Sequence, residues 1–345
     1  MKPITVIGGG LAGLTLGIAL RQRDVPVTIF EAGRYPRHRV CGEFVSGRGR
    51  DVLRRLGLEE KFLAVGARRA TTTAFSSARG GEFKSDLPET ALCLSRYVMD
   101  GLLAAEFQAL GGQLHTNERR QEEVQEGMVR ATGRRTKTAV EGWRWFGLKS
   151  HARHVEMSAD VEVHLLPEGY VGLCRLDAET VNVCGLFRSR APVPDLAQKW
   201  PAWLRGDDSR NPTLRERLGE AEFCPDTFCS VSGLWFSPQA ASLHGEFCIG
   251  DAITMIAPFT GNGMSMAFES AELAAGPLTA YSQGSVSWKA AAAATAEACD
   301  RMFAPRLKWS QILQNGLLSR QTSGALIWLA ARAPAVWRLL YARMR

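Results

Sequence analysis

The sequence predicts an α/β protein (α+β overall) in which a Rossmann-type parallel-sheet domain is interrupted by an antiparallel sheet and followed by helices. Three observations predict it. Residues 4–31 read as strand, glycine turn, helix and strand, which is the start of a parallel, buried sheet. Residues 161–165 and 181–187 alternate apolar and polar side chains, as strands of an antiparallel sheet do. From residue 267 onward the apolar spacing is helical.

The expected elements follow one another along the chain with ordinary start and stop signals. Ser95 is an N-cap residue, and Gly111 stops the helix that begins there. The expected elements are strands over 4–7, 25–30 and 247–249, helices over 11–23, 51–58 and 95–110, a loop over 35–50 and a turn at 168–169. They divide the chain into a nucleotide-binding domain at 1–68, 91–135 and 245–285, a substrate domain at 69–90 and 136–244, and a helical region at 286–345.

Composition narrows the class of protein. The chain has 345 residues, of which 46% are hydrophobic and 22% charged, as in a globular protein with a sizeable core. Its eight cysteines form no CxxC pair, and no signal peptide precedes the first strand, so we expect a cytoplasmic, reducing setting. The net charge of +7 belongs to residues 301–345, which hold eight basic and no acidic side chains. The remainder is nearly neutral, which argues against a nucleic-acid-binding protein.

A glycine motif follows the first expected strand. In Gly8-x-Gly10-x-x-Gly13 the first glycine permits the turn, the second lets the backbone approach a pyrophosphate, and the third lets helix and strand pack closely. The helix N-terminus offers free N–H groups and partial positive charge to phosphates. Glu31 ends the next strand, where a carboxylate can accept hydrogen bonds from ribose hydroxyls. This motif predicts dinucleotide binding but does not distinguish FAD from NAD.

A second motif lies about 240 residues further along and points to FAD. Gly250-Asp251 ends an apolar run, and residues 258–264 read Pro-Phe-Thr-Gly-Asn-Gly-Met before a helical segment. The pair of motifs resembles the p-hydroxybenzoate hydroxylase-like flavoprotein superfamily. Within it, the second motif looks most like that of the geranylgeranyl reductase family. The resemblance extends from Ile4 to about Leu313.

The resemblance implies a set of FAD-binding residues. Asp251 would bond the ribityl chain or pyrophosphate, and residues 261–264 would bring backbone N–H groups against the flavin ring. Residues 37–43 resemble the family's basic-Cys-Gly-Glu loop, in which Cys41 lies near the flavin and is the candidate catalytic residue. The implied cofactor-binding residues are Gly8, Gly10, Leu11, Ala12, Gly13, Glu31, Ala32, Arg39, Cys41, Gly42, Arg96, Gly250, Asp251, Gly261, Asn262, Gly263 and Met264.

Several positions depart from the patterns of relatives. Residues 131–133 lack the aspartate with which related hydroxylases help to hold FAD and the nicotinamide donor, so NADPH or NADH is expected only by analogy. The segment around Tyr170 matches the aromatic motif of archaeal lipid reductases in part, without its Trp and Phe-Pro. Trp143-Arg144-Trp145 resembles the Trp-x-Trp of flavin halogenases, but the Ile-Pro is missing, and we interpret it as sheet packing.

Other candidate residues carry weaker signals. His151-x-x-His154 lacks a third ligand nearby, so no metal is expected. His164 lies in an alternating strand and, with Tyr170, is a candidate substrate residue, although a hydrogen-bonded sheet histidine is the alternative. The tail from Ala325 to Arg345 combines Trp and Leu with arginines. Such a segment either packs on the domain as a helix with its arginines in solvent or lies on the inner surface of an anionic membrane.

The predicted function is an FAD-dependent oxidoreductase acting on an apolar isoprenoid, quinone or polyketide-like substrate. Hydride transfer from reduced flavin to a carbon–carbon double bond is the favoured reaction, with Cys41 or a water supplying the proton. An FAD-dependent monooxygenase of aromatic or polyketide-like substrates is the first alternative. A flavin-free binder of lipids or prenylated proteins on the same fold is the second, and colourless purified protein would favour it.

Overall fold

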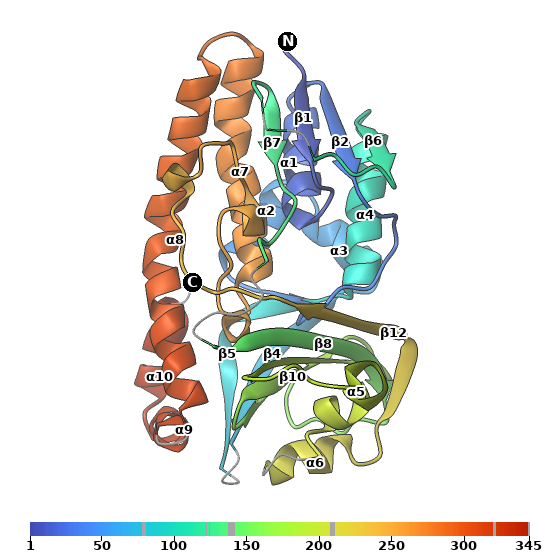
Figure 1. Cartoon of the computed structure of the whole chain (residues 1–345), viewed down its shortest axis with the longest axis vertical. Coiled ribbons are helices and arrows are strands. Elements are labelled where there is room, and N and C mark those ends of the chain that lie inside the picture. Colours follow the sequence, from blue (N-terminus) through green and yellow to red (C-terminus); the bar gives the residue numbers. More distant parts are fainter. Residues whose placement is uncertain are drawn as a thin grey trace.

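The computed structural model describes residues 1–77, 81–121, 123, 125–136, 142–207, 211–319 and 322–343. Two sheets organise these residues, a four-stranded one in the order β6-β2-β1-β7 and an eight-stranded one in the order β12-β8-β11-β10-β9-β4-β5-β3 (Figure 1). Figure 1 shows the small sheet at the end of the molecule that holds the N-terminus and the large sheet at the other end. The predicted fold class is confirmed, and the domain boundaries stay a prediction.

The small sheet is parallel throughout. The central strand β1 (Ile4–Ile7) pairs with β2 (Val27–Glu31) and β7 (Met128–Arg130), and β6 (Gln113–Thr116) pairs with β2. Helix α1 (Leu11–Arg21) is buried along most of its length, as expected for a helix enclosed between a sheet and other helices.

Two further helices pack against α1, the helix that covers the small sheet. Helix α4 (Arg96–Ala109) packs on α1, where a Cβ at Gly17 would come within 2.8 Å of Ile29 and Phe107. The predicted cap is confirmed, because the Val98 N–H donates to the Ser95 hydroxyl at 3.3 Å. Helix α7 (Gly263–Ser282) packs against α1 from the C-terminal half of the chain.

Three local predictions differ from the structure in bounds or type. The helix expected over 51–58 is α2 (Arg48–Arg55), which begins earlier and ends before Gly57, where φ is +68°, and a separate helix α3 (Glu59–Ala64) follows. The loop expected over 35–50 contains this helix start and the short strand β3 (Phe44–Val45). The strand expected over 247–249 is a single bridge between Cys248 and Arg130, after which the 3₁₀ turn η2 (Gly250–Ala252) begins.

The large sheet separates two hydrophobic layers. The predicted strands at 161–165 and 181–187 are confirmed. One face packs on α5 (Leu196–Arg205) and α6 (Pro212–Leu218), and the other faces the parallel domain. The remaining strands are β4 (Arg68–Ser76), β5 (Glu82–Cys93), β8 (Arg144–Arg153), β9 (Val161–Leu166), β10 (Gly169–Arg175), β11 (Val181–Ser189) and β12 (Glu222–Ser232).

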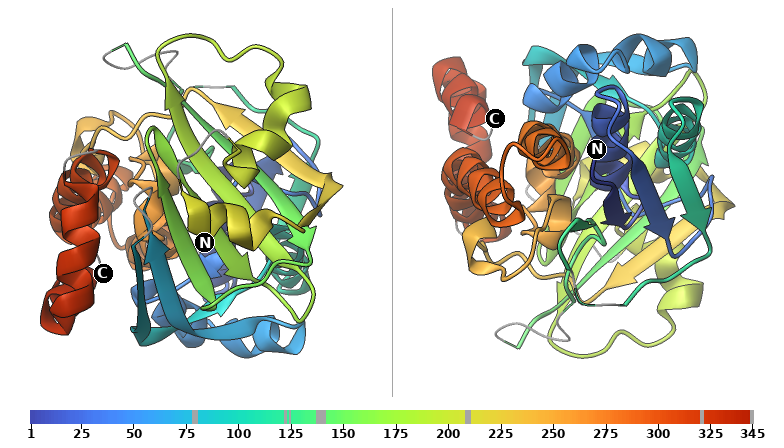
Figure 2. Two further views of the ribbon diagram at one scale, coloured as in Figure 1. Left: turned by 90° about the horizontal axis from the view of Figure 1, so that it is seen from below. Right: turned by 90° about the horizontal axis from the view of Figure 1, so that it is seen from above.

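The C-terminal region is helical. Helix α8 (Trp288–Leu318) lies along α7, and α9 (Ser323–Arg332) and α10 (Pro334–Arg343) follow it on the same side of the molecule (Figure 2). A buried ion pair joins the two long helices, since Arg306 donates to both oxygens of Glu269 at 2.8 and 2.7 Å. Within the described part of the chain, no helix has both the length and the apolar character needed to cross a bilayer.

Candidate active site

A cleft of about 660 Å³ lies between the parallel domain and the inner face of the large sheet. Segments far apart in the sequence line it: the first glycine turn, the loop over 37–44, the start of α4 and the segments near 251 and 258–264. A second hollow of about 670 Å³ lies against α4 and residues 34–36, and it contains none of the predicted cofactor residues. The cleft is therefore the candidate site.

One end of the cleft is formed by the first glycine turn. Gly8 has a φ of +109°, and a Cβ there would come within 2.3 Å of the Ala131 carbonyl oxygen, so only glycine fits. Gly10 is the N-cap of α1 and has no side chain that could cap the helix. A Cβ built on it meets no atom within 4 Å. The N-terminus of an 11-residue helix thus opens into the cleft, with N–H groups suited to a pyrophosphate.

Glu31 borders the same end of the cleft as a carboxylate. Its oxygens accept the N–H groups of Gly9 and Gly33, both at 2.9 Å, and pair with Arg37 at 2.5 Å. Burial raises the pKa of Glu31, but the Gly33 N–H and the charges of Arg37 and Arg39 lower it by more. These contacts fix an ionised carboxylate at the cleft wall, as hydrogen bonding to a ribose requires.

Two arginines approach the middle of the cleft. The Arg96 guanidinium donates to both oxygens of Asp100, at 2.7 and 2.9 Å, and Arg39 donates to the same carboxylate at 3.2 Å. Asp100 is fully buried, while the side chain of Arg39 is one-third exposed. Asp100 therefore orients both cations, which remain available to a diphosphate in the cleft.

The far end of the cleft is formed by the second glycine turn. Gly261 has a φ of +66°, and a Cβ there would come within 2.2 Å of the Phe44 ring. Gly263 begins the 20-residue helix α7, and a Cβ on it meets nothing within 4 Å. Asp251 lies on the wall between the two turns, where burial raises its pKa to about 6 against the opposing charges of Arg96 and Arg134.

Most of the predicted cofactor residues line this one cleft, and three do not. Gly13 lies behind the turn, where a Cβ would be 2.0 Å from the Gly8 carbonyl oxygen, and Gly250 donates its N–H to the Ser270 hydroxyl at 2.9 Å. Asn262 is fully buried beneath the second turn. Those that line it are Gly8, Gly10, Leu11, Ala12, Glu31, Ala32, Arg39, Cys41, Gly42, Arg96, Asp251, Gly261, Gly263 and Met264.

The two predicted substrate residues lie on opposite faces of the large sheet. Tyr170 lines the cleft, whereas His164 does not. The buried ring of His164 instead contacts Ser76, with Nδ1 and Oγ 2.7 Å apart, and Glu162, with Nε2 and Oε2 3.0 Å apart. This Ser-His-Glu chain was missed from the sequence. Ser76 is only 1% exposed, so no substrate reaches it, and the interaction is structural.

Protonated thiols and a phenol border the cleft. Cys41 and Cys184 both line it, and burial raises the pKa of each thiol. For Cys41 the nearby Arg96 charge opposes that rise. Burial and these two thiols also hold the pKa of Tyr170 well above its ordinary value. The cleft therefore presents undissociated weak acids at neutral pH, not nucleophilic thiolates.

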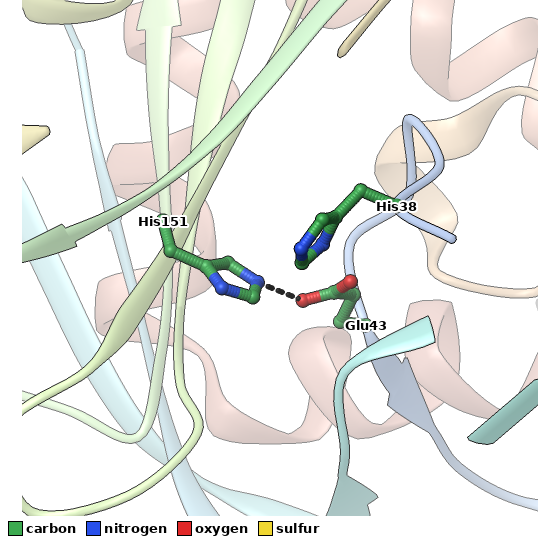
Figure 3. A group of neighbouring side chains, drawn as sticks. All are labelled: His38, Glu43 and His151. Carbon is green, nitrogen blue, oxygen red and sulfur yellow. Dashed lines mark hydrogen bonds and ion pairs between the residues drawn. The ribbon is translucent and has the colours of Figure 1, made fainter. Parts of the chain in front are cut away.

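A buried ionic cluster beneath the loop over 37–43 was also missed from the sequence. Glu43 accepts from His151 Nε2 at 2.8 Å (Figure 3) and lies 3.3 Å from Lys149 Nζ, which is 3.1 Å from His38 Nδ1. Glu43 and Lys149 are fully buried. Lys149 and His151 are two residues apart, so their side chains lie on one face of β8. This spacing of two charged or titratable residues in a strand is the sequence pattern that could have indicated the cluster.

We interpret the cluster as an ion-pair network and not as a metal site, because the Lys149 ammonium group lies among the possible ligand atoms. Possible ligand atoms of His38, Glu43 and His151 lie within 4.8 Å of one another, but Lys149 contacts two of these side chains. Burial and the charges of Lys149 and His151 lower the pKa of His38 to about 4. His154 faces elsewhere, 3.7 Å from Glu222. The histidines of His151-x-x-His154 thus have different partners.

Comparison with known proteins agrees with this geometry. Residues 1–142 match the family model described as FAD binding domain. The N-terminal part of the chain is therefore similar to FAD-binding domains. No curated protein matches the sequence. The match supports an enzyme of the FAD-dependent oxidoreductase class, and the glycine turns, the ionised Glu31 and the open helix N-terminus at Gly10 fit that cofactor.

Solved flavoproteins share the fold over nearly the whole chain. The flavin-dependent brominase Bmp2 is 18% identical with a TM-score of 0.77, over 99% of this chain and 93% of its own. A flavoprotein/dehydrogenase from Cytophaga hutchinsonii is 15% identical with a TM-score of 0.78, over 99% and 92%. PqsL from Pseudomonas aeruginosa, a probable FAD-dependent monooxygenase, is 15% identical with a TM-score of 0.70, over 95% and 99%. At these identities the likeness establishes the fold.

The Trp-x-Trp segment packs on the sheet, as predicted. The Trp143 ring lies 4.2 and 4.3 Å from the guanidinium carbons of Arg188 and Arg190, and the Trp145 ring contacts Phe236 edge-on at 5.4 Å. Neither tryptophan lines the cleft. The segment therefore gives no support to halogenation, although several of the similar structures are halogenases.

Asp251 gives the first testable prediction. Its pKa in the folded protein is about 6, above the ordinary value of 3.8, so the folded state binds more protons and loses stability as pH rises between these values. We expect Asp251→Asn to stabilise the flavin-free protein at pH 8 by up to about 3 kcal/mol and to change nothing below pH 4. Urea unfolding at both pH values measures this difference. An equal effect at the two pH values would contradict the assignment.

Proposed function

We propose that the protein is a geranylgeranyl reductase-like enzyme that reduces a carbon–carbon double bond of an apolar substrate with electrons from FAD. The observation that carries the proposal is the pairing, in one cleft, of an FAD cradle with the undissociated acids Cys41 and Tyr170. A reduction of this kind needs one hydride and one proton on adjacent carbons.

The proton is held by the chain itself. Bound FAD, once reduced, supplies the hydride. The Cys41 thiol, kept protonated by burial, gives its proton to the neighbouring carbon as the double bond becomes a single bond. The Arg96 charge stabilises the thiolate that remains, and solvent restores its proton. The Asn182 amide donates to the Cys41 carbonyl oxygen at 2.9 Å and fixes the loop that carries the thiol.

Apolar side chains form the wall that a substrate meets beyond the thiols. They come from strands of the large sheet, from the loop after β12 and from the segment before the second glycine turn, and they share one hydrophobic cluster with Tyr170. Such a wall favours an isoprenoid, quinone or polyketide-like molecule and excludes water from the reacting atoms. The residues are Val163, Leu186, Leu234, Met255 and Phe259.

The test of this proposal is anaerobic turnover by the FAD-loaded protein with NADPH or NADH as the trial donor. A reductase keeps working without oxygen. We expect Cys41→Ser, assayed at saturating FAD, to slow anaerobic reduction of an isoprenoid or quinone at least about 100-fold, because a poorer acid replaces the thiol. Cys229→Ser, a change at another cleft thiol, is the matched control and should retain activity. An unchanged rate in Cys41→Ser would overturn the role of the thiol.

The second candidate function is an FAD-dependent monooxygenase of aromatic or polyketide-like substrates. The shared fold with PqsL and with the halogenases favours it. The same assay separates the two, because a monooxygenase consumes oxygen and incorporates one of its atoms into the product. If substrate is converted only in air and gains oxygen, this candidate replaces the reductase.

A further inference from the structure

The C-terminal helices α9 and α10 have an unusual charge and exposure pattern. The sequence from residue 301 to its end has eight basic and no acidic side chains. Figure 1 shows both helices at the end of the molecule opposite the N-terminus, and α9 contacts β5. Arg320 and Arg345 lie outside the described residues, and the basic side chains on α9 and α10 are Arg332, Arg338 and Arg343.

The inner faces of these helices are fixed on the large sheet. Ile327, Trp337 and Tyr341 are buried in one hydrophobic cluster. The Trp337 ring contacts Phe75 and Phe83 edge-on, with centroids 5.3 and 5.7 Å apart. The same cluster contains Tyr170 and Leu186, which line the cleft. The helices therefore pack firmly on the large sheet, and their inner faces contact the hydrophobic cluster that also forms the apolar wall of the cleft.

The outer faces are apolar and basic. Trp328 and Leu329 on α9 are 55% and 41% exposed, and Leu339 on α10 is 55% exposed. The Arg332 guanidinium lies 4.6 Å from the Trp328 ring. The exposed side chains recur at helical spacing on each helix, as Ala325, Trp328, Leu329 and Arg332 on α9 and as Ala335, Arg338, Leu339 and Ala342 on α10. A helix face turned toward water alone normally carries polar side chains of both signs.

We propose that the outer face of α9 and α10 docks on the surface of an anionic lipid bilayer. Exposed Trp and Leu side chains can enter the interface between headgroups and acyl chains, and the arginines can pair with lipid phosphates. Charge complementarity favours this partner, because the charged side chains on α9 and α10 are all arginines, namely Arg332, Arg338 and Arg343. The docked helices bring the apolar end of the cleft to the bilayer, in which an apolar substrate dissolves. This inference goes beyond the proposed reaction and is tested without turnover.

The experiment is sedimentation of the full chain with vesicles of phosphatidylcholine alone or mixed with phosphatidylserine. We expect binding to the mixed vesicles that weakens as salt rises. The triple variant Trp328→Ser, Leu329→Ser and Leu339→Ser should bind at least about tenfold more weakly, because the side chains that enter the interface are lost. All three side chains are exposed, so the variant should keep the thermal stability and FAD content of the wild type.

Leu243→Ser is the matched control. Leu243 is a 78% exposed apolar residue far from α9 and α10 in sequence, and its removal should leave vesicle binding unchanged. Absence of binding to the phosphatidylserine vesicles, or equal binding by the triple variant, would overturn the proposal. Equal binding to both vesicle types would remove the electrostatic part of the argument and overturn it as stated. None of these results bears on the flavin reaction, so the two proposals fail independently.

Discussion

Gly10→Ala is expected to lower the affinity for FAD about 10- to 100-fold while leaving the protein folded. The backbone at Gly10 has φ −80° and ψ −171°, which alanine adopts without strain, and its new Cβ would meet no protein atom within 4 Å. The methyl group would instead fill the space where the pyrophosphate approaches the N-terminus of α1. Loss of one charge-assisted hydrogen bond, worth about 1.5–3 kcal/mol, gives this range.

Two further glycine substitutions provide a second test and a control for that experiment. Gly263→Ala, at the second turn, likewise meets no protein atom within 4 Å and should weaken FAD binding, because it borders the other end of the cleft. Gly276→Ala is the control, since Gly276 lies exposed within α7 and also has open space around its Cβ. Fluorescence titration with FAD measures all three. If Gly10→Ala binds FAD as tightly as Gly276→Ala does, the first turn does not hold the cofactor.

The second large effect is expected at Glu43. Glu43→Ala should destabilise the fold by about 3–5 kcal/mol, because Lys149 would be left as a buried charge without its carboxylate. Chemical unfolding measures the loss. Glu272→Ala is the control, since its ion pair with Arg55 lies at the surface, and it should cost no more than about 1 kcal/mol.

The double variant Glu43→Gln with Lys149→Met separates loss of charge from loss of packing. It removes both charges, so it should recover most of the stability that Glu43→Ala loses. The pKa of Glu43 is lowered, because the hydrogen bond from His151 and the charge of Lys149 outweigh the effect of burial. Its stabilisation is therefore complete above the ordinary pKa of 4.5 and is lost as pH falls through the lower folded value. Glu43→Gln should lack this acid-dependent loss.

The parts of the fold with local signals were predictable from the sequence. The turn at Gly8–Gly13 and the cap at Ser95 depend on neighbouring residues, and the structure has both. The alternation over 181–187 likewise predicts which side chains share a face of a strand. The bounds of α2 and the separate helix α3 were missed, because Gly57, which has a positive φ, was expected to lie inside one helix.

The ionic parts of the site were not predictable, because they depend on contacts between distant segments. Glu43 and His151 are 108 positions apart, and only the packing of the loop over 37–43 on β8 brings them together. The face of His164 was also ambiguous. Alternation places it opposite Val163, but which face meets the cleft depends on where the parallel domain docks. The sequence around His164 does not indicate which face of the large sheet packs against the parallel domain.

We propose that two distant glycine turns bind one FAD, with the first at the diphosphate and the second at the flavin ring. Titration of the flavin-free protein with FAD, followed by flavin fluorescence, tests it most directly, with ADP and riboflavin as separate competitors. We expect saturation at one FAD per chain and displacement by either fragment. Absence of saturable binding, or displacement by neither fragment, would contradict it.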